Sequence, residues 1–440
     1  MTSTWTDWSG QQWCMPKRHE RPADEAGVAG AVRRAAADGL VVRPVGAGHS
    51  FTPLCVTDGV QLDLSRLHRL LGVDADGVAR VQAGMTLREL SLALHARGRA
   101  LEILGDIDRQ AVAGALATAT HGTGAAFGNL SVLMVGGRLV TADGSVRDLA
   151  DPAQPDLLPA ARVSLGALGV LTEVLLRTVP AFRLHKREEQ RPLRDVLDRL
   201  DELAVSADHV DVYAVPWSSR ALVMASQRTD EPAAPPAALR TWINDDLLAN
   251  TALGLIQRTG RRFPGTHPVL GRVTGAAISR STRLDHSHRV FSTERKILFT
   301  ESEWALPRAA AREAVESVMS LIERRRLPVS FPIELRFAAG DDALLSTAYG
   351  RDTAYLAVHQ YVGSDWAPYF RAVEEVMLDL DGRPHWAKRH EAASAVLAPR
   401  YPGWQRFGDV RARLDPDGVF VNDHLARTLG VTRDRGRSSA

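Results

Sequence analysis

The chain has 440 residues, 45% of them hydrophobic, with 54 basic and 52 acidic side chains and a formal net charge of +2. This length exceeds the size at which a single hydrophobic core stops growing, so a large globular protein of two domains is expected. The balanced charge gives no reason to expect nucleic acid as a partner. Cys14 and Cys55 lack C-x-x-C spacing, which argues against a disulfide framework and a structural zinc site and favours a reducing, cytoplasmic compartment.

The hydropathy of the chain bears on membranes and export. No run approaches the ~18 consecutive apolar residues of a membrane-spanning helix. Residues 1–20 contain no apolar core of signal-peptide length. We therefore expect no transmembrane segment and no export, while association with a membrane surface and the oligomeric state stay open.

The N-terminal part of the chain predicts a helix, a strand and a glycine turn. Residues 22–39 have acids in the first turn and a glycine after the last apolar turn, as a helix with a stop signal does. Residues 41–50, VVRPVGAGHS, predict a buried strand that runs into a turn. Gly46 and Gly48 let the backbone take positive φ and approach a ligand, and successive N–H groups there can bind an anion. A Rossmann fingerprint fits poorly because Phe51 stands at its third glycine.

Hairpins and short helices are expected next. The helix over residues 86–98 begins with a capping box of Thr86 and Glu89. Residues 113–120, AGALATAT, have one bulky side chain, Leu116, so this helix should lie against something other than a leucine-filled core, with tight packing on a sheet as the alternative. Alternating runs around turn residues predict strands at residues 59–64 and 78–81, on both sides of residues 142–144, and within residues 164–179.

The second half of the chain predicts an α+β domain. Charged helical stretches alternate there with strands, and three prolines within residues 230–238 predict a loop. Pro307 suits the first position of a long helix. Helices are expected at residues 192–203, 307–326, 367–380 and 410–414, and strands at residues 210–215, 329–337 and 355–361.

Residues 105–124, GDIDRQAVAGALATATHGTG, place the small-residue helix between two polar turns. Together with the turn at residues 41–50, this stretch resembles the aldonolactone oxidoreductases and the related alditol oxidases, FAD enzymes of the vanillyl-alcohol oxidase superfamily. PIELR at residues 332–336, HWAK at residues 385–388 and NDH at residues 422–424 are similar to further motifs of that family. The resemblance spans almost the whole chain.

The resemblance implies an α+β fold with a two-part FAD-binding domain of the vanillyl-alcohol oxidase (PCMH) type over residues 1–182. An α+β substrate cap domain would cover residues 183–400. Residues 401–440 would form a C-terminal segment that returns to the flavin.

The resemblance also implies which residues bind FAD. His49 stands where many members bond the flavin 8α-methyl group through a ring nitrogen, so covalent FAD is predicted; without the resemblance, a histidine after glycine is usually a satisfied polar residue. Gly105 and Asp106 would lie against the reactive edge of the isoalloxazine, where the missing side chain leaves room for oxygen and favours an oxidase. The implied cofactor-binding residues are Val45, Gly46, Ala47, Gly48, His49, Ser50, Gly105, Asp106, Gly114, Thr118, His121, Gly122, Thr123, Gly124, Val170 and His424. No metal is expected.

The candidate catalytic residues lie near the C-terminus. Glu334 and Arg336 are two apart in a predicted strand, so both point to one face while their apolar neighbours point to the core. Spacing alone favours a surface salt bridge, but the resemblance implies that both reach the substrate hydroxyls. Lys388 resembles the active-site lysine of the family, although Ala387 replaces a frequent glycine. His359 is a weaker candidate, because a core histidine fits its strand equally well.

The resemblance implies hydride transfer from a secondary alcohol of a sugar-derived aldono-1,4-lactone to flavin N5, followed by reoxidation by molecular oxygen to give hydrogen peroxide. The alternatives are an alditol oxidase that acts on an open-chain polyol and a lactone dehydrogenase that uses another acceptor. GDIDRQ followed by THGTG is more similar to the lactone branch. A flavin or nucleotide binder without turnover is disfavoured, because Glu334, Arg336 and Lys388 are all present.

Overall fold

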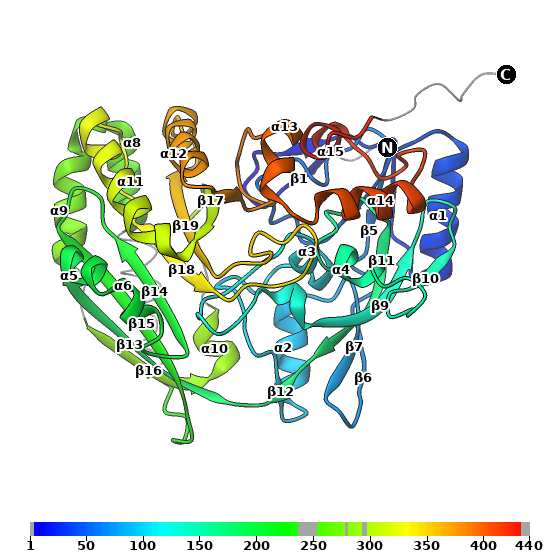
Figure 1. Ribbon diagram of the computed structural model, residues 1–440, viewed down its shortest axis with the longest axis horizontal. Helices are drawn as coiled ribbons and strands as arrows, with labels where there is room; N and C mark the ends of the chain where they lie inside the picture. The colour runs from blue at the N-terminus through cyan, green and yellow to red at the C-terminus, as the bar shows by residue number, and fades with distance from the viewer. Residues whose placement is uncertain (1–3, 236–252, 278–279, 293–296, 433–440) are drawn as a thin grey trace.

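The computed structural model describes residues 4–235, 253–277, 280–292 and 297–432, and Figure 1 shows two halves that lie side by side. The first half is made by the N-terminal part of the chain together with its C-terminal helices. The second half is built on one large sheet. Residues 236–238 of the loop expected from its prolines lie outside the described residues.

The N-terminal half contains two main sheets. Three parallel strands have the order β3-β5-β4, and five antiparallel strands have the order β10-β9-β11-β7-β6. The strands are β1 Trp5–Thr6, β2 Trp13–Cys14, β3 Arg18–Glu20, β4 Val42–Val45, β5 Val60–Asp63, β6 Leu70–Val73, β7 Val78–Gln82, β8 Arg99–Ala100, β9 Met134–Val140, β10 Val146–Asp148, β11 Val170–Arg177 and β12 Val179–Pro180.

The first two helices of this half form within the ranges that the sequence predicts. Helix α1 (Glu25–Ala37) is capped by Asp24, which accepts from the backbone of Gly27, and Gly39 follows it with φ +64°. Helix α2 (Leu87–His95) has the expected capping box of Thr86 and Glu89. The remaining helices are α3 Val112–Ala117, the 3₁₀ turn η1 Leu130–Leu133 and α4 Leu157–Arg162.

The small-residue helix α3 has two different faces. Val112, Ala115 and Leu116 are buried in the largest hydrophobic core, so one side packs as an ordinary core helix. On the other side Gly114 is exposed, and a Cβ added there would meet no atom within 4 Å. The sequence-based expectation of a helix without a leucine-filled core is therefore wrong for the first face, while the second face leaves an open surface.

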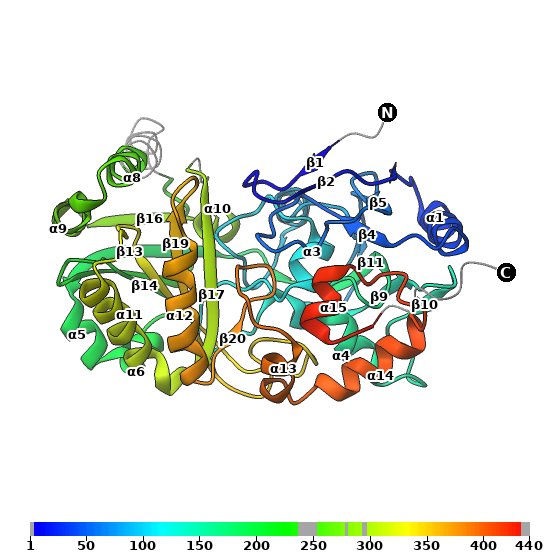
Figure 2. The same cartoon turned by 90° about the horizontal axis from the view of Figure 1, so that it is seen from above.

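The second half is an eight-stranded antiparallel sheet of order β16-β13-β15-β14-β18-β19-β17-β20. Its strands are β13 Arg183–Pro192, β14 His209–Ala214, β15 Arg220–Thr229, β16 Ser281–His286, β17 Phe299–Pro307, β18 Ile333–Ala338, β19 Thr353–Tyr361 and β20 Arg383–Pro384. Helices α5 (Leu193–Asp198), α6 (Leu200–Ala204), α11 (Ala311–Arg325) and α12 (Ala367–Asp379) share one apolar core with this sheet, and Figure 2 shows α12 running beside β17.

Two features of this half differ from the sequence-based expectations. Pro307 does not begin the long helix: it ends β17 and precedes a 3₁₀ turn, with α11 starting at Ala311. The strand β17 was not predicted. It contains Glu301 and Glu303, and glutamate is depleted in strands generally. Helices α8 (Leu253–Arg262), α9 (His267–Ala277) and α10 (Ser287–Phe291) complete the half.

The end of the chain packs back on the first half. Helices α13 (Ser394–Leu397), α14 (Trp404–Leu414) and α15 (Asp423–Leu429) contribute Leu397, Phe407 and Leu425 to the core that holds α2 and α3. Helix α14 packs against α4 of the first half. No helix among the described residues is both long and apolar enough to cross a bilayer.

Candidate active site

The face of the large sheet opposite its helices is polar, and the strand register explains which side chains meet there. Asp211 of β14 lies opposite Arg336 of β18, and Tyr213 lies opposite Glu334. Farther along the same face of the sheet, Glu301 of β17 lies opposite His359 of β19. Residues directly opposite in an antiparallel pair point to the same face. The alternate positions Val212, Leu335, Leu356 and Trp304 lie in the apolar core with the helices.

Arg336 is the centre of one cluster on this face. Its side chain is 10% exposed and pairs with Glu334, and it lies 3.1 Å from Asp211 and 3.4 Å from Asp106. Tyr213 donates a hydrogen bond of 2.6 Å to Glu334. Burial alone would lower the pKa of Arg336, but the carboxylates of Glu334 and Asp106 raise it well above its usual range. Arg336 is therefore a permanent cation beside a pair of fixed carboxylates.

Lys388 is the centre of a second cluster. It pairs with Glu301, which lies 3.7 Å from the ring of His359, and its Nζ lies 5.3 Å from the ring centroid of Phe51. Burial would lower the pKa of Lys388, but Glu301 and the neighbouring carboxylates raise it, Asp106 among them. Asp106 therefore acts electrostatically on both cations, and the two clusters form one polar site.

A buried ion pair lies behind Lys388. His121 Nδ1 lies 2.8 Å from the carbonyl oxygen of Gly122, and Nε2 lies 3.1 Å from Glu303. Both ring nitrogens thus face oxygen atoms. Burial would raise the pKa of Glu303, but His121 and then His385 hold it well below its usual range. The arrangement is a buried histidine–carboxylate pair.

The ring of His385 completes this group. The ligand atoms of His121, Glu303 and His385 lie within 4.8 Å of one another, a spacing that a metal ion can also use. Burial lowers the pKa of His385 to about 3, and its Nδ1 accepts from the backbone N–H of Ala387. These hydrogen bonds account for three of the four ring nitrogens without further ligands.

The two predicted cofactor turns lie next to each other. A Cβ on Gly46 would meet the Cβ of Ala111 at 2.6 Å, so the glycine turn packs against the start of α3. Gly46, Ala47 and Gly114 are exposed although their neighbouring strand and helix are buried. Gly48 has φ +68°, the left-handed conformation that favours glycine. This surface of small residues fits a flat, extended cofactor, and it ends at His49.

His49 leads from that surface to the polar site. Its ring stacks on Trp8 with centroids 5.6 Å apart. Burial, together with the charges of Lys388 and Arg109, lowers the pKa of His49 to about 4. The imidazole is therefore neutral at physiological pH, with one ring nitrogen holding a free electron pair.

The other predicted cofactor residues are spread along this surface and behind it. Thr123 donates to the carbonyl of Val210 and accepts from the backbone of Phe337 at 3.2 Å, and Gly124 donates to the same residue at 2.8 Å. These bonds join the THGTG turn to the large sheet. Three further residues lie away from the charged clusters: Val170 in the core with β4 and α1, Thr118 at the C-terminal end of α3, and His424 on α15. Ser50 directly follows His49 and is half-buried.

Several site residues were missed by the sequence analysis. Asp211 and Tyr213 stand two apart in a strand that was predicted, so their shared face was available as a signal. Glu301 and Glu303 have the same spacing, but their strand was not predicted. The role of His385 as a partner of Glu303 had no signal, because it depends on contacts between segments far apart in the sequence.

Comparison with known proteins agrees with this geometry. A family model described as an FAD binding domain matches residues 16–150, and a model described as D-arabinono-1,4-lactone oxidase matches residues 174–428. A cholesterol oxidase described as solvent-stable superposes with a TM-score of 0.81, covering 98% of each chain at 18% identity. At that identity the likeness concerns the fold alone, which is the FAD-binding architecture of the PCMH type with a cap.

The relatives in sequence are more specific. L-gulono-1,4-lactone dehydrogenase from Mycobacterium tuberculosis is 48% identical over 98% of this chain and 100% of that protein. L-gulonolactone oxidase from Mus musculus is 30% identical, covering 96% of this chain and 97% of that protein. Alditol oxidase from Streptomyces sp. is 32% identical, covering 98% and 100%.

The fold and the charged site over a small-residue surface define an FAD-dependent oxidoreductase with a substrate cap. Within that class the chain belongs to the D-arabinono-1,4-lactone oxidase family. The resemblance noted in the sequence is thereby confirmed.

Proposed function

We propose that the protein oxidises a secondary alcohol of a sugar-derived aldono-1,4-lactone, with FAD held between the glycine turn and the polar face of the cap sheet. The observation that carries this proposal is the pairing of two buried cations, Arg336 and Lys388, with carboxylates on one polar face. A polyhydroxylated substrate suits such a face, because its hydroxyls can replace the internal ion-pair contacts. The family and its lactone-named relatives support the lactone class.

Bound FAD supplies the hydride acceptor. During oxidation the substrate carbon loses a hydride and the hydroxyl loses a proton, so negative charge develops on the oxygen. Arg336 and Lys388 would hold that oxygen and stabilise the charge. Glu334, fixed by Tyr213, would accept hydrogen bonds from the substrate hydroxyls and orient the reacting C–H bond. His359, whose Nε2 lies 3.7 Å from the carboxylate of Glu301, would help to hold that carboxylate in position.

The test is anaerobic mixing of the FAD-loaded enzyme with a panel of aldonolactones and open-chain polyols. We expect the lactones to bleach the flavin. The alditol oxidase relative keeps a polyol oxidase as the second candidate, and bleaching by polyols alone would favour it. A flavin that no member of either class reduces would contradict both.

We further propose that His49 bonds the flavin covalently. A neutral imidazole is the nucleophilic form, and the lowered pKa of His49 keeps it in that form. Acid precipitation is expected to leave yellow colour in the pellet, and His49→Ala is expected to release it to the supernatant. Flavin found wholly in the supernatant of the unmutated protein would rule out the bond while leaving FAD binding intact.

Molecular oxygen is the electron acceptor that Gly105 favours. A Cβ added at Gly105 would lie 3.2 Å from the carbonyl oxygen of His121. A larger side chain there would be crowded, and we expect it to extend toward the position that the resemblance assigns to the reactive edge of the flavin. Gly105→Val is expected to slow reoxidation by oxygen at least about tenfold, which is ~1.4 kcal/mol of barrier, while an artificial dye still supports turnover.

The control for this prediction is Gly72→Ala, since a Cβ on Gly72 meets no atom within 4 Å. An unmutated enzyme whose reduced flavin does not react with oxygen would instead be a dehydrogenase.

We also propose a cytoplasmic location, because both cysteines are free.

A further inference from the structure

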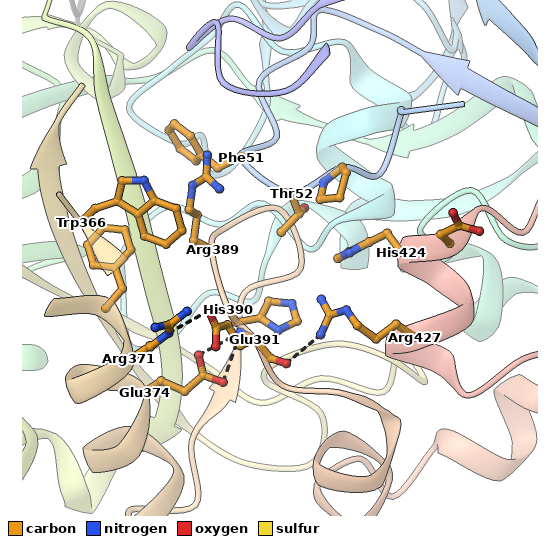
Figure 3. A pocket seen from close by; sticks show the side chains of 13 residues that line it. Phe51, Thr52, Trp366, Arg371, Glu374, Arg389, His390, Glu391, His424 and Arg427 are labelled. Atoms are coloured by element: carbon orange, nitrogen blue, oxygen red, sulfur yellow. Dashed lines mark hydrogen bonds and ion pairs between the residues drawn. The ribbon is translucent and has the colours of Figure 1, made fainter. Parts of the chain in front are cut away.

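A cavity lies beside the proposed active site, between the cap and the C-terminal helix α15 (Figure 3). Its volume is about 330 Å³, which is within the range of small-molecule sites. Trp366 and Phe370 of α12 form one wall, Phe51 and Thr52 another, and His424 points in from α15. Aromatic and apolar side chains form these walls, and the rest of the lining is polar or charged, with the carboxylates Glu374, Glu391 and Asp423 among it.

Two buried histidines of this cavity lack partners. His390 and His424 are 8% and 7% exposed, and their ring centroids lie 6.2 Å apart. The Nε2 atoms of both have no hydrogen-bond partner among the described residues. Burying a polar group without a partner is unfavourable, so two in one cavity indicate a ligand with oxygen or nitrogen atoms. Burial lowers the pKa of both rings far below neutrality, so both are uncharged.

The arginines around the cavity are already engaged. Arg371 lies 3.0 Å from Glu391, and Arg427 donates 2.7 Å to the carbonyl of the same residue. Arg389 stacks over Trp366 at 4.4 Å and donates to Thr300. The carboxylate of Glu374 accepts from the backbone N–H of Glu391, whose own carboxylate pairs with Arg371. With these charged groups engaged and the imidazoles neutral, the cavity suits an uncharged ligand, and its aromatic walls suit a flat one.

The cavity and the proposed active site share a wall. The backbone N–H of Phe51 donates 2.7 Å to the carbonyl of Ala387, and Thr52 donates 2.9 Å to the carbonyl of Trp386. The segment that follows His49 is thereby fastened to the segment that carries Lys388. Phe51 lines the cavity and also lies against Lys388, so one layer of side chains separates the two spaces.

We propose that this cavity binds a quinone as an electron acceptor, with one of its carbonyl oxygens hydrogen-bonded by both His390 and His424 and its ring against Trp366. The inference rests on the proposed function, because it needs the flavin beside His49. In the step, reduced FAD gives up two electrons and two protons and returns to the oxidised state. The quinone takes them up, each carbonyl oxygen gaining one hydrogen, and leaves as hydroquinone.

The first experiment measures binding without turnover. Oxidised FAD-loaded enzyme is titrated calorimetrically with a water-soluble benzoquinone such as 2,3-dimethoxy-5-methyl-1,4-benzoquinone. We expect one site per chain, with about tenfold weaker binding in His390→Gln and in Trp366→Leu. Trp366 is half-buried, so its variant keeps the test valid if the histidine variant does not fold. Glu375→Gln is the control, since Glu375 is an exposed residue of the same helix.

The second experiment measures electron transfer without the lactone. The flavin is reduced with dithionite and mixed anaerobically with the quinone, so failure of the lactone reaction does not affect the result. Reoxidation that saturates with quinone concentration, and whose half-saturation rises about tenfold in both variants while ferricyanide reoxidation is unchanged, would support the site. Equal quinone binding and equal reoxidation in all variants, or reoxidation that stays linear in quinone, would overturn it.

Discussion

Arg336→Ala and Lys388→Ala are each expected to lower the anaerobic rate of flavin reduction by substrate at least ~10²-fold. Both cations are largely buried, with side chains 10% and 20% exposed, and would donate to the oxygen that gains negative charge. Such a contact is stronger in the transition state than in the ground state, so its loss lowers the rate at saturating substrate. Stopped-flow bleaching of the flavin measures this rate directly.

Variants of Glu334 separate binding from chemistry. Glu334→Gln keeps the shape of the side chain and one acceptor oxygen, so we expect weaker substrate binding with a smaller loss of rate at saturation.

Arg336→Lys tests geometry, because a lysine cannot reproduce the forked contacts of a guanidinium with several carboxylates. Arg80→Ala is the control, since Arg80 is an exposed arginine whose ion pair with Glu173 lies on the other half of the chain.

Structural damage must be distinguished from chemical loss in these variants. Removing Arg336 leaves Glu334, Asp211 and Asp106 as a group of carboxylates without their cation, and burial already raises the pKa of Asp211 to about 6. The variants are therefore compared only where the flavin spectrum and the unfolding transition match the unmutated enzyme. If both reduce their flavin at the unmutated rate at saturating lactone, these residues form a structural ion network.

Local features of the fold followed from the sequence because their causes are local. The capping box of α2, the stop of α1 and the glycine turn after β4 each depend on a few neighbouring residues. Glu334 and Arg336 alternate with apolar residues, and this pattern correctly predicted that the apolar residues face the core. Family motifs then placed these elements in an FAD enzyme.

The rest depended on pairing between distant segments. Every residue of β17 from Phe299 to Leu306 is buried, because helices cover one face and the N-terminal half covers the other. That environment explains why Glu301 and Glu303 sit in a strand, against their usual preference. The register that sets Asp211 opposite Arg336 is likewise a property of the assembled sheet. Pro307 was misplaced because a proline fits the end of a strand as well as the start of a helix.

Glu303→Gln is expected to destabilise the protein by about 3–5 kcal/mol at neutral pH. The change replaces the carboxylate at Nε2 of His121 with a neutral amide, while Nδ1 still faces the Gly122 carbonyl. Both side chains are almost fully buried, at 3% and 6% exposure, so water cannot replace the lost partner. Chemical denaturation of the FAD-loaded enzyme, monitored by circular dichroism, measures the change.

The pH dependence gives an independent check of the same pair. The pKa of Glu303 is held well below its usual range in the folded protein, whereas an unfolded glutamate has a pKa of about 4.3. Its contribution to stability is therefore fully present above the unfolded pKa and is lost as the pH falls through the folded one. We expect the difference between the two proteins to shrink as acidification takes the pH below about 4.3, the pKa of the unfolded glutamate.

The matched control is Glu316→Gln, which breaks an ion pair of 3.0 Å with Arg312 on the surface of α11. Both side chains there are about half exposed, at 48% and 51%, so the expected cost is much smaller and falls with added salt. Equal costs for Glu303→Gln and Glu316→Gln would mean that the His121–Glu303 pair is hydrated in solution. The ion pair would then not be what fixes the THGTG turn against β17.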